Sequence, residues 1–459
     1  MEYRTPTMTP TMTPSMSRSS NTRIATQKST NARIHNREMG ELDHQYKFIN
    51  PINRIQIERE EFMKNSHDDP DESPSERNVD FDRRMPMRPE VSINKPHDYQ
   101  PSRRQAPKDI ASFNPYSEFA DINADTKLSD GLQNSKSCIN GINNYGFFLF
   151  DNMLNVMNSA FVFSPYLIYS IFAPLFVASS GNTEIELKNY FNYPRADILT
   201  AGIKDISSDN LKNFGNCIIF SDEIDYNPEF CKNINMMSKI RKINKSRYIK
   251  EVDEINNIIR NMSNLSKKSV GYETIKTSSV TLVNYGYVQP TWTSYFSKSV
   301  KQHDLDFIMA FGQTFGYFEQ PELQVLEINS VEGLCFGIIL GDIELNDKTF
   351  KLITQNLKPT ILDEVKIPKF SLTTKLRYTN LLKETDLKTV FMDLNCPYLF
   401  KSECEITDCL QNIEFHVTEK SIKTEKTTGF KTTRKFIVDR SFRFYLRTSQ
   451  NVIILMGSY

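Results

Sequence analysis

The sequence lacks the cysteine and histidine patterns that mark disulfide frameworks and metal sites. Its seven cysteines are odd in number and include no Cys-x-x-Cys pair, and its six histidines are scattered along the chain. A zinc ribbon needs ligand pairs at short spacing, and a disulfide scaffold normally uses an even set of cysteines. We therefore predict a protein without a metal or another cofactor.

The chain also lacks an excess of either charge. Its 56 lysines and arginines balance 56 aspartates and glutamates, so the formal net charge is zero. Non-specific nucleic-acid binding depends on a broad basic field that attracts phosphate, and this composition provides none. The basic run KIRKINKSRYIK at residues 239–250 is better explained as a solvated face than as an anion site. We predict no nucleic-acid partner.

No set of residues in the sequence resembles a catalytic constellation. We recognise neither a Ser-His-Asp arrangement nor a cluster of metal ligands. His416, which lies in a strand-like stretch, is more simply explained as a structural histidine. These observations predict that the protein is not an enzyme.

A secretion signal and a clear membrane span are missing as well. The N-terminal stretch MEYRTPTMTP has no apolar core, so we predict residence inside a cell or a virus particle. An abundance of asparagine, lysine and isoleucine would suit the AT-rich genome of a large DNA virus or a parasite. The longest apolar run, FVFSPYLIYSIFAPLFVASS, approaches the length of a membrane span. Pro165, Pro174 and the polar residues that follow favour a buried helix instead.

Residues 1–135 differ in composition from the remainder of the chain. The N-terminus repeats a Thr-Pro-x-Met unit, and later stretches such as HDDPDESPSER are charged and rich in proline. Proline lacks the amide donor that a helix needs, and polar segments bury too little apolar surface to offset chain entropy. We predict a disordered extension over residues 1–135 and one folded domain over residues 136–459.

The folded part begins with helical patterns and ends with strand patterns. Apolar residues recur at helical spacing in NNYGFFLFDNMLNVM, and VDEINNIIRNMSNL has the same periodicity. SVTLVNYGYV, LCFGIIL and three short stretches near the C-terminus are rich in β-branched and aromatic residues, which is typical of strands. Helices and strands segregated in this way within one domain predict an α+β fold.

Five stretches, in the same order along the chain, resemble the signatures of the serpin family. FVFSPYLIYSIF is similar to the Ser-Pro pair that opens a long buried helix, and ASSGNTEIELKNYFNY is similar to the turn and helix that follow. LVNYGYVQPTW resembles the strand that runs from an asparagine, here Asn284, to a tryptophan, here Trp292. IPKF at residues 367–370 and FIVDRSFRFYLRTSQNVIILMG at residues 436–457 complete the resemblance.

The resemblance implies three β-sheets with surrounding helices and a reactive-centre loop at about residues 419–436. In inhibitory serpins a protease cleaves this loop, and the N-terminal part of the loop then inserts as a new strand into the central sheet. The resemblance also implies a region where that sheet opens, formed here by Ser164, Asn284, Trp292 and Gln411. Gln411 takes the place of the family's histidine, and we expect it to bond to Asn284 and hold the sheet shut.

The hinge of the loop departs from the family's composition. The family has glycine, threonine and a run of alanines where this chain has mostly charged residues. Because a strand alternates its side chains, one register would bury Lys426, which the alignment points inward, and the other would bury Lys423 and Glu425. An unpaired buried charge costs several kcal/mol, so neither register favours fast insertion. The predicted hinge consists of Glu419, Lys420, Ser421, Ile422, Lys423, Thr424, Glu425, Lys426, Thr427 and Thr428.

Two counts place the scissile bond of the loop at different positions. Counting forward from Glu419 by the family's spacing gives the Lys435-Phe436 bond, whereas counting back from Phe442 gives a position near Phe430. The loop is therefore short and presents a bait poorly, although its basic residues would suit a trypsin-like protease.

We therefore predict a non-inhibitory serpin-family protein that acts as a partner-binding or structural scaffold. The alternative is an intracellular inhibitor of a trypsin-like serine protease or of a cysteine protease, with the loop as bait. The composition of the hinge favours the first function. Both functions need a protein partner, whose identity the sequence leaves open together with the oligomeric state.

Overall fold

The computed structural model describes residues 124–207, 211–302, 305–422 and 433–459. Most of the predicted extension and residues 423–428 of the predicted hinge lie outside these ranges. Residues 124–135, which the sequence assigned to the extension, form the first part of helix α2 (Ala124–Val156). The helix therefore begins before the predicted domain boundary at residue 136.

Helix α3 (Pro165–Ala178) contains most of the longest apolar run, as predicted. Ser164 caps the helix by accepting a hydrogen bond from the amide of Leu167 at 3.2 Å, and proline at the first helical position needs no amide partner. Every side chain of the helix except that of Val177 is buried. Within the described residues, no helix is long and apolar enough to cross a membrane.

Further helices pack against α3 and contribute aromatic side chains to the core. Helices α2, α4 (Asn182–Phe191) and α5 (Ala196–Ile206) all contact α3. The ring of Phe191 stacks on that of Phe172 with a centroid distance of 5.1 Å. Shorter helices of the described part include α6 (Pro228–Ile234), η4 (Lys245–Arg247), α9 (Asp347–Asn356), α10 (Thr379–Lys383) and α11 (Lys388–Met392).

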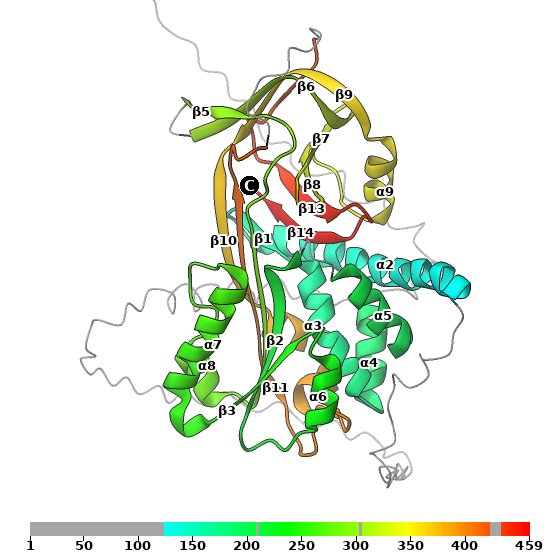
Figure 1. Cartoon of the computed structure of the whole chain (residues 1–459), viewed down its shortest axis with the longest axis vertical. Helices are drawn as coiled ribbons and strands as arrows, with labels where there is room; N and C mark the ends of the chain where they lie inside the picture. The colour runs from blue at the N-terminus through cyan, green and yellow to red at the C-terminus, as the bar shows by residue number, and fades with distance from the viewer. Residues whose placement is uncertain (1–123, 208–210, 303–304, 423–432) are drawn as a thin grey trace, which may run out of the picture. The chain divides into compact units, whose positions relative to one another are not determined.

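A five-stranded sheet forms the centre of the fold (Figure 1). Its central strands β11 and β4 are parallel, with Ile406 opposite Val280 at one end and Phe415 opposite Val288 at the other. The outer neighbours pair with them in antiparallel fashion, and β3 pairs with β2 in parallel. The strand order is β10 (Phe370–Arg377), β11 (Ile406–Val417), β4 (Val280–Val288), β2 (Phe214–Ser221) and β3 (Lys239–Ile243).

The remaining strands form a nine-stranded network that is shared by two sheets. Its long strand β6 (Leu305–Gln320) pairs with β5 and β9 over its first part and with β7 at its end. Strand β6 pairs with strands in both halves of this network. The three sheets expected for the fold therefore occur as the five-stranded sheet and the two halves of this network. The order is β1 (Phe161–Phe163), β14 (Ile453–Ser458), β13 (Arg443–Thr448), β8 (Leu334–Leu340), β7 (Leu323–Asn329), β6, β9 (Lys358–Pro368) and β12 (Lys435–Ile437), with β5 (Ser297–Gln302) beside β6.

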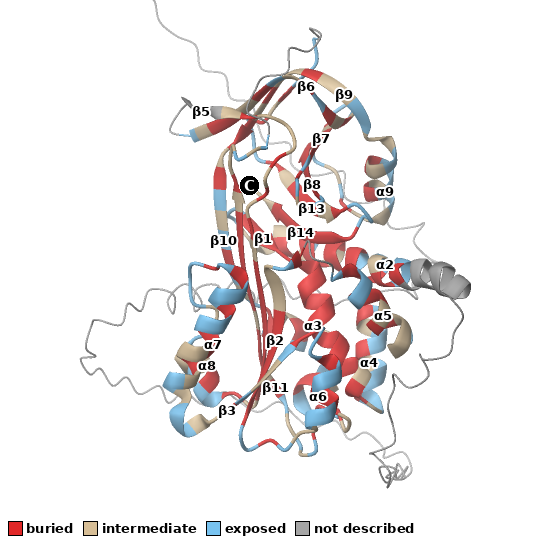
Figure 2. Ribbon diagram, in the orientation of Figure 1, coloured by how far each residue is buried: buried red, intermediate tan, exposed pale blue. Residues whose placement is uncertain are grey.

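Both faces of the five-stranded sheet are covered. Leu282 of β4 belongs to the main apolar core with α3, whereas Val283 and Tyr285 join a second apolar cluster with α7 (Tyr248–Ser263) and α8 (Tyr272–Thr277). Figure 2 shows buried residues along the strands and α3, and exposed residues on the outer sides of α7 and α8. Because successive side chains of a strand point to opposite faces, a strand added at the centre of this sheet would be buried on both faces.

Candidate functional site: the seam between β4 and β11 and the loop after it

The pairing of β4 with β11, which we call the seam, is closed by direct hydrogen bonding between the two strands. Nine residue pairs lie opposite each other along it. Neighbouring strands in a sheet are about 4.8 Å apart, so no further strand lies between them. The five-stranded sheet is therefore closed at its centre in this structure.

A row of polar side chains crosses the sheet at the seam. Gln411, Asn284 and Asn216 lie opposite one another on β11, β4 and β2. The amide of Asn284, which is fully buried, donates to the carbonyl of Leu167 at 3.0 Å and to Asn216 Oδ1 at 2.8 Å. Its Oδ1 accepts a 2.6 Å hydrogen bond from the hydroxyl of Tyr378. Asn284 thus connects the seam to helix α3 and to the end of β10.

Gln411 makes a different contact from the one expected. Its Oε1 accepts from the amide of Ser164 at 2.8 Å, and its Nε2 donates to the carbonyl of Ser164 at 3.1 Å. The expected bond to Asn284 is replaced because a glutamine amide offers a donor and an acceptor that match both backbone groups of one residue. Gln411 therefore ties β11 to the start of α3, while Asn284 is satisfied by other partners.

Two residues of this network were not predicted from the sequence. Asn216 donates to Ser170 Oγ at 2.8 Å as well as accepting from Asn284, and Tyr378 supplies the hydroxyl described above. The polar first residue of the strand-like stretch NCIIFS was a usable signal for Asn216. Tyr378 follows a strand with ordinary alternation, so nothing in the local sequence distinguishes it.

Trp292 lies beyond the end of β4 and holds the first hinge residues. Its backbone amide donates to the carbonyl of Lys420 at 2.8 Å, and its carbonyl accepts from the amide of Ile422 at 3.0 Å. The indole, which is fully buried, donates from Nε1 to the carbonyl of Thr418 at 2.6 Å. Trp292 therefore anchors the chain where it leaves the sheet, and its part in opening the sheet stays a prediction.

The described hinge residues differ in how firmly they are held. Glu419 forms an ion pair with Lys369 at 2.9 Å, and both side chains are about one-third exposed. An ion pair this exposed contributes about 1 kcal/mol or less, because water screens it. The side chain of Ile422 is 59% exposed despite its backbone bond to Trp292. The described hinge residues are thus anchored mainly through their backbone.

The Lys435-Phe436 bond, predicted as the scissile bond, lies inside β12. Phe436 is fully buried beside the ring of Tyr317, and Lys435 pairs with Glu364 of β9 at 2.8 Å. Proteases cut exposed segments that they can hold in an extended form, and β12 would first have to separate from β9. A cut at this bond would therefore require β12 to separate from β9, and the carbonyl of Arg434 also bonds to β9. The position of the scissile bond stays a prediction. The alternative position near Phe430 falls outside the described residues.

The described histidine and cysteine side chains have structural environments. His416 Nδ1 lies 2.8 Å from Ser371 Oγ, and its ring packs against Tyr287. All seven cysteines are free, and burial raises the pKa of Cys217 to about 12 and that of Cys231 to about 11. Such thiols stay protonated and unreactive near neutral pH. Among the described residues, no group of three or more potential ligands is placed to hold a metal ion.

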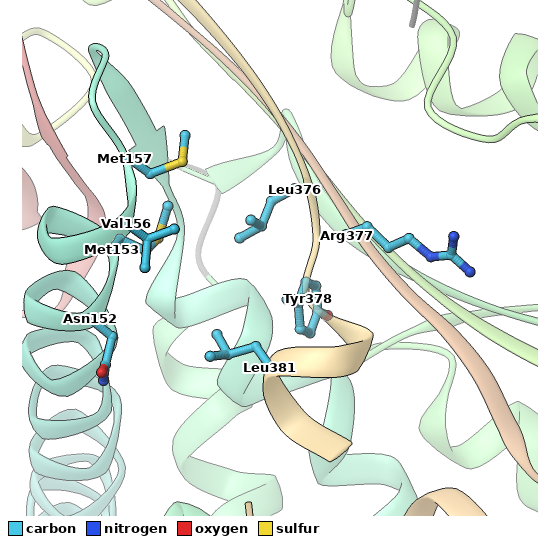
Figure 3. A pocket seen from close by; sticks show the side chains of 8 residues that line it. All are labelled: Asn152, Met153, Val156, Met157, Leu376, Arg377, Tyr378 and Leu381. Atoms are coloured by element: carbon cyan, nitrogen blue, oxygen red, sulfur yellow. The ribbon is translucent and has the colours of Figure 1, made fainter. Parts of the chain in front are cut away.

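A small apolar cavity lies beside the polar row (Figure 3). Its volume is about 60 Å³, whereas small-molecule sites usually measure about 300–1,000 Å³. In Figure 3 the side chain of Arg377 points away from the enclosed space, and its guanidinium pairs with the buried Asp408 at 2.6 Å. The cavity is therefore too small for a typical ligand site. It is lined by Asn152, Met153, Val156, Met157, Leu376, Arg377, Tyr378 and Leu381.

These features describe a five-stranded sheet that is closed at its centre and is followed by a chain segment anchored at Trp292. The family model described as Serpin (serine protease inhibitor) matches residues 140–459, which is more than half of the chain. The protein therefore belongs to the serpin family, as the resemblance of five sequence stretches predicted.

Individual relatives are distant from this chain in sequence. A serine protease inhibitor of Mus musculus is 24% identical over 264 residues, which are 50% of this chain and 63% of the relative. The matched part thus spans less than two thirds of that relative's length.

The structural matches extend over nearly the whole length of each similar solved structure. Serpin48 of the insect Tenebrio molitor has a TM-score of 0.60 at 19% identity, over 70% of this chain and 97% of that one. Human thyroxine-binding globulin in complex with its thyroid hormone has a TM-score of 0.61 at 14% identity, over 71% and 98%. Uncleaved ovalbumin has a TM-score of 0.63 at 13% identity, over 70% and 99%. At these identities the likeness shows the fold, and the predicted α+β, serpin-like fold class is confirmed.

Proposed function

We propose that this serpin-family protein does not trap proteases and that its folded domain is a scaffold for a protein partner. The observation that carries the proposal is the environment that hinge residues would meet inside the seam. On the face toward α3, the seam is lined by Leu282 and Val288 of β4 and by Ile413 and Phe415 of β11, all buried in the main core. Lys426, which the alignment points toward this face, would bring an ammonium group among them at a cost of several kcal/mol.

The opposite register offers no easier route. On the face toward α7, the seam is lined by Val283 and Tyr285, which are buried beneath that helix. In the register that points Lys426 toward α3, alternation directs Lys423 and Glu425 to this face. A shift by one residue exchanges the two faces, so Lys423 and Glu425 would be desolvated beneath α3 and Lys426 beneath α7.

Ile422, the last described residue of the hinge, acts in the other direction, but its effect is smaller. Ile422 is 59% exposed, so insertion would remove apolar surface from water. Complete burial of an isoleucine contributes roughly 1.5–3 kcal/mol, and only the exposed part of this side chain is available. The gain is therefore less than the cost of burying Lys426 without a partner.

Mixing the intact protein with trypsin tests the proposal. We expect a denaturing gel to show cleavage of the loop and no covalent adduct of the two proteins. The matched variant carries Ser421→Gly, Lys423→Ala, Glu425→Ala and Lys426→Ala, which removes the three charges that insertion would bury and leaves Glu419, Lys420 and the rest of the chain unchanged. An adduct with the variant alone would support the role of the hinge, and an adduct with the unmodified protein would contradict the proposal.

The alternative function, inhibition of a trypsin-like or cysteine protease, is favoured by one observation. Eleven residues, 423–433, separate the anchored Ile422 from Arg434, and the seam has nine residue pairs. A loop of this length could fill the seam after a cut near its C-terminal end. Repeating the gel assay with a cysteine protease tests this function, because an adduct resistant to denaturation is expected only from an inhibitor.

A further inference from the structure

Met262 lies where the surface of the protein meets the second apolar cluster. It belongs to the last turn of α7, and the residue is 37% exposed. Its Sδ accepts a 3.6 Å hydrogen bond from the hydroxyl of Tyr285, a residue of β4 that is only 2% exposed. A partly exposed thioether is thus the hydrogen-bond partner of a buried hydroxyl group.

The hydroxyl of Tyr285 is confined to this partner. Among the described residues, no other acceptor lies within hydrogen-bonding distance of it. Gly215 lies opposite Tyr285 on β2, and a Cβ added to this glycine would be 2.4 Å from the hydroxyl oxygen, so that side is already filled. Burial raises the pKa of Tyr285 above its ordinary value, so the hydroxyl keeps its proton and remains a donor.

A thioether is a poor acceptor for such a donor. The sulfur of methionine accepts hydrogen bonds only weakly, and a buried polar group without a good partner lowers stability. Oxidation of methionine gives a sulfoxide, whose polar oxygen is a far stronger acceptor. In most apolar surroundings that oxygen is disruptive, but beside Tyr285 it would meet an O–H donor whose present partner is weak.

We propose that Met262 is a site of oxidative modification by a peroxide and that the hydroxyl of Tyr285 binds the sulfoxide. A sulfur lone pair attacks one oxygen of hydrogen peroxide, an S–O bond forms and the O–O bond breaks. The proton of the transferred oxygen passes to the departing hydroxide, which leaves as water. Sulfur is oxidised in this step and the peroxide is reduced. Because a methionine side chain has several rotatable bonds, the new oxygen can turn toward Tyr285.

Other methionines of the folded domain provide internal comparisons. Met236 and Met392 are 49% and 78% exposed, and among the described residues no hydroxyl donates to the sulfur of either. Met153 is only 5% exposed. In the folded protein, peroxide should therefore oxidise Met236, Met262 and Met392 and leave Met153 reduced. The sulfoxide of Met262 alone would gain a buried hydrogen-bond donor.

A double-mutant cycle in which oxidation is one of the two changes tests the proposal on the full chain. Tyr285→Phe removes the hydroxyl, and the stability that it costs is measured by urea unfolding before and after treatment with hydrogen peroxide. Peptide mass spectrometry confirms the conversion of Met262. We expect Tyr285→Phe to cost more after oxidation, by about fivefold in the unfolding equilibrium constant, because the hydroxyl then has a stronger acceptor.

Met262→Leu is the matched control, because it removes this sulfur and leaves Met236 and Met392 to be oxidised. In that background peroxide should not change the cost of Tyr285→Phe.

Three results would overturn the proposal. One is a cost of Tyr285→Phe that is equal or smaller after oxidation of Met262. Another is Met262 that stays reduced while Met236 and Met392 are oxidised. The third is an increased cost that persists in Met262→Leu, which would assign the effect to other methionines. The assay uses uncut protein without a protease, so its result is separate from the test of the proposed function.

Discussion

Replacement of Asn284 by alanine should be among the most destabilising single changes in the folded domain. The substitution removes the amide that donates to Leu167 and Asn216 and the oxygen that accepts from Tyr378. The side chain of Asn284 is fully buried. Leaving a buried polar group unsatisfied costs about 1–3 kcal/mol, and three partners lose a bond here. Allowing for partial relaxation, we expect a loss of about 4 kcal/mol.

The assay is urea unfolding followed by fluorescence of the single tryptophan, with Asn155→Ala as the matched control. Asn155 is exposed on α2, where its amide bonds to the carbonyl of Asp151 within the same helix, so its loss should cost about 0.5 kcal/mol or less. A loss below about 1 kcal/mol for Asn284→Ala would refute the reasoning, because it would mean that the row of polar side chains does not stabilise the closed seam.

The same network predicts coupling between its members. Tyr378→Phe removes only the hydroxyl that donates to Asn284 and should cost about 1–2 kcal/mol. Since both changes break the same bond, the double variant should lose less than the sum of the two single losses. Additive losses would show that the bond between Tyr378 and Asn284 contributes nothing to stability.

Three further predictions concern the hinge and the buried thiols. Trp292→Phe replaces the indole by a smaller aromatic ring that lacks the donor to Thr418, so trypsin should cut after Lys420 several-fold faster, measured as the initial rate on a gel. Glu419→Gln should change the urea midpoint by less than the equivalent of about 1 kcal/mol, since the pair with Lys369 is partly exposed. Burial raises the pKa of Cys217 from 9.0 to about 12, so the unfolded thiol loses its proton first and stability should fall between pH 9 and 12. Cys217→Ala should show a smaller fall, and an identical fall would contradict the assignment.

The sequence was most informative where local patterns and family signatures coincide. The Ser-Pro pair before a charge-free apolar run predicted the start of a buried helix, and α3 begins at that proline, Pro165. Asn284 and Gln411 were placed at one region of the sheet, and they lie opposite each other in the seam. These predictions succeeded because a buried polar residue among apolar neighbours needs specific partners.

The sequence was least informative where tertiary contacts decide. The side chain of Gln411 can reach either Asn284 or the backbone of Ser164, and only the packing of α3 against the sheet selects the second. The Lys435-Phe436 bond looked like an exposed loop because basic residues precede it, yet pairing with β9 buries Phe436. The bonds of Glu414 to Ser266 join residues 148 positions apart, which no local pattern indicates.

Thermal unfolding before and after a limited trypsin cut tests the central claim most directly. At present one row of hydrogen bonds joins β4 to β11 along the nine residue pairs of the seam. Insertion of the cut loop would replace it by two rows, one on each side of the new strand. At about 1 kcal/mol for each of about nine additional bonds, and 2–4 °C for each kcal/mol, the Tm would rise by roughly 20–35 °C. We predict a change of less than about 5 °C, because the hinge charges keep the loop outside. A rise of the larger size would contradict the account and would identify the protein as one whose loop inserts.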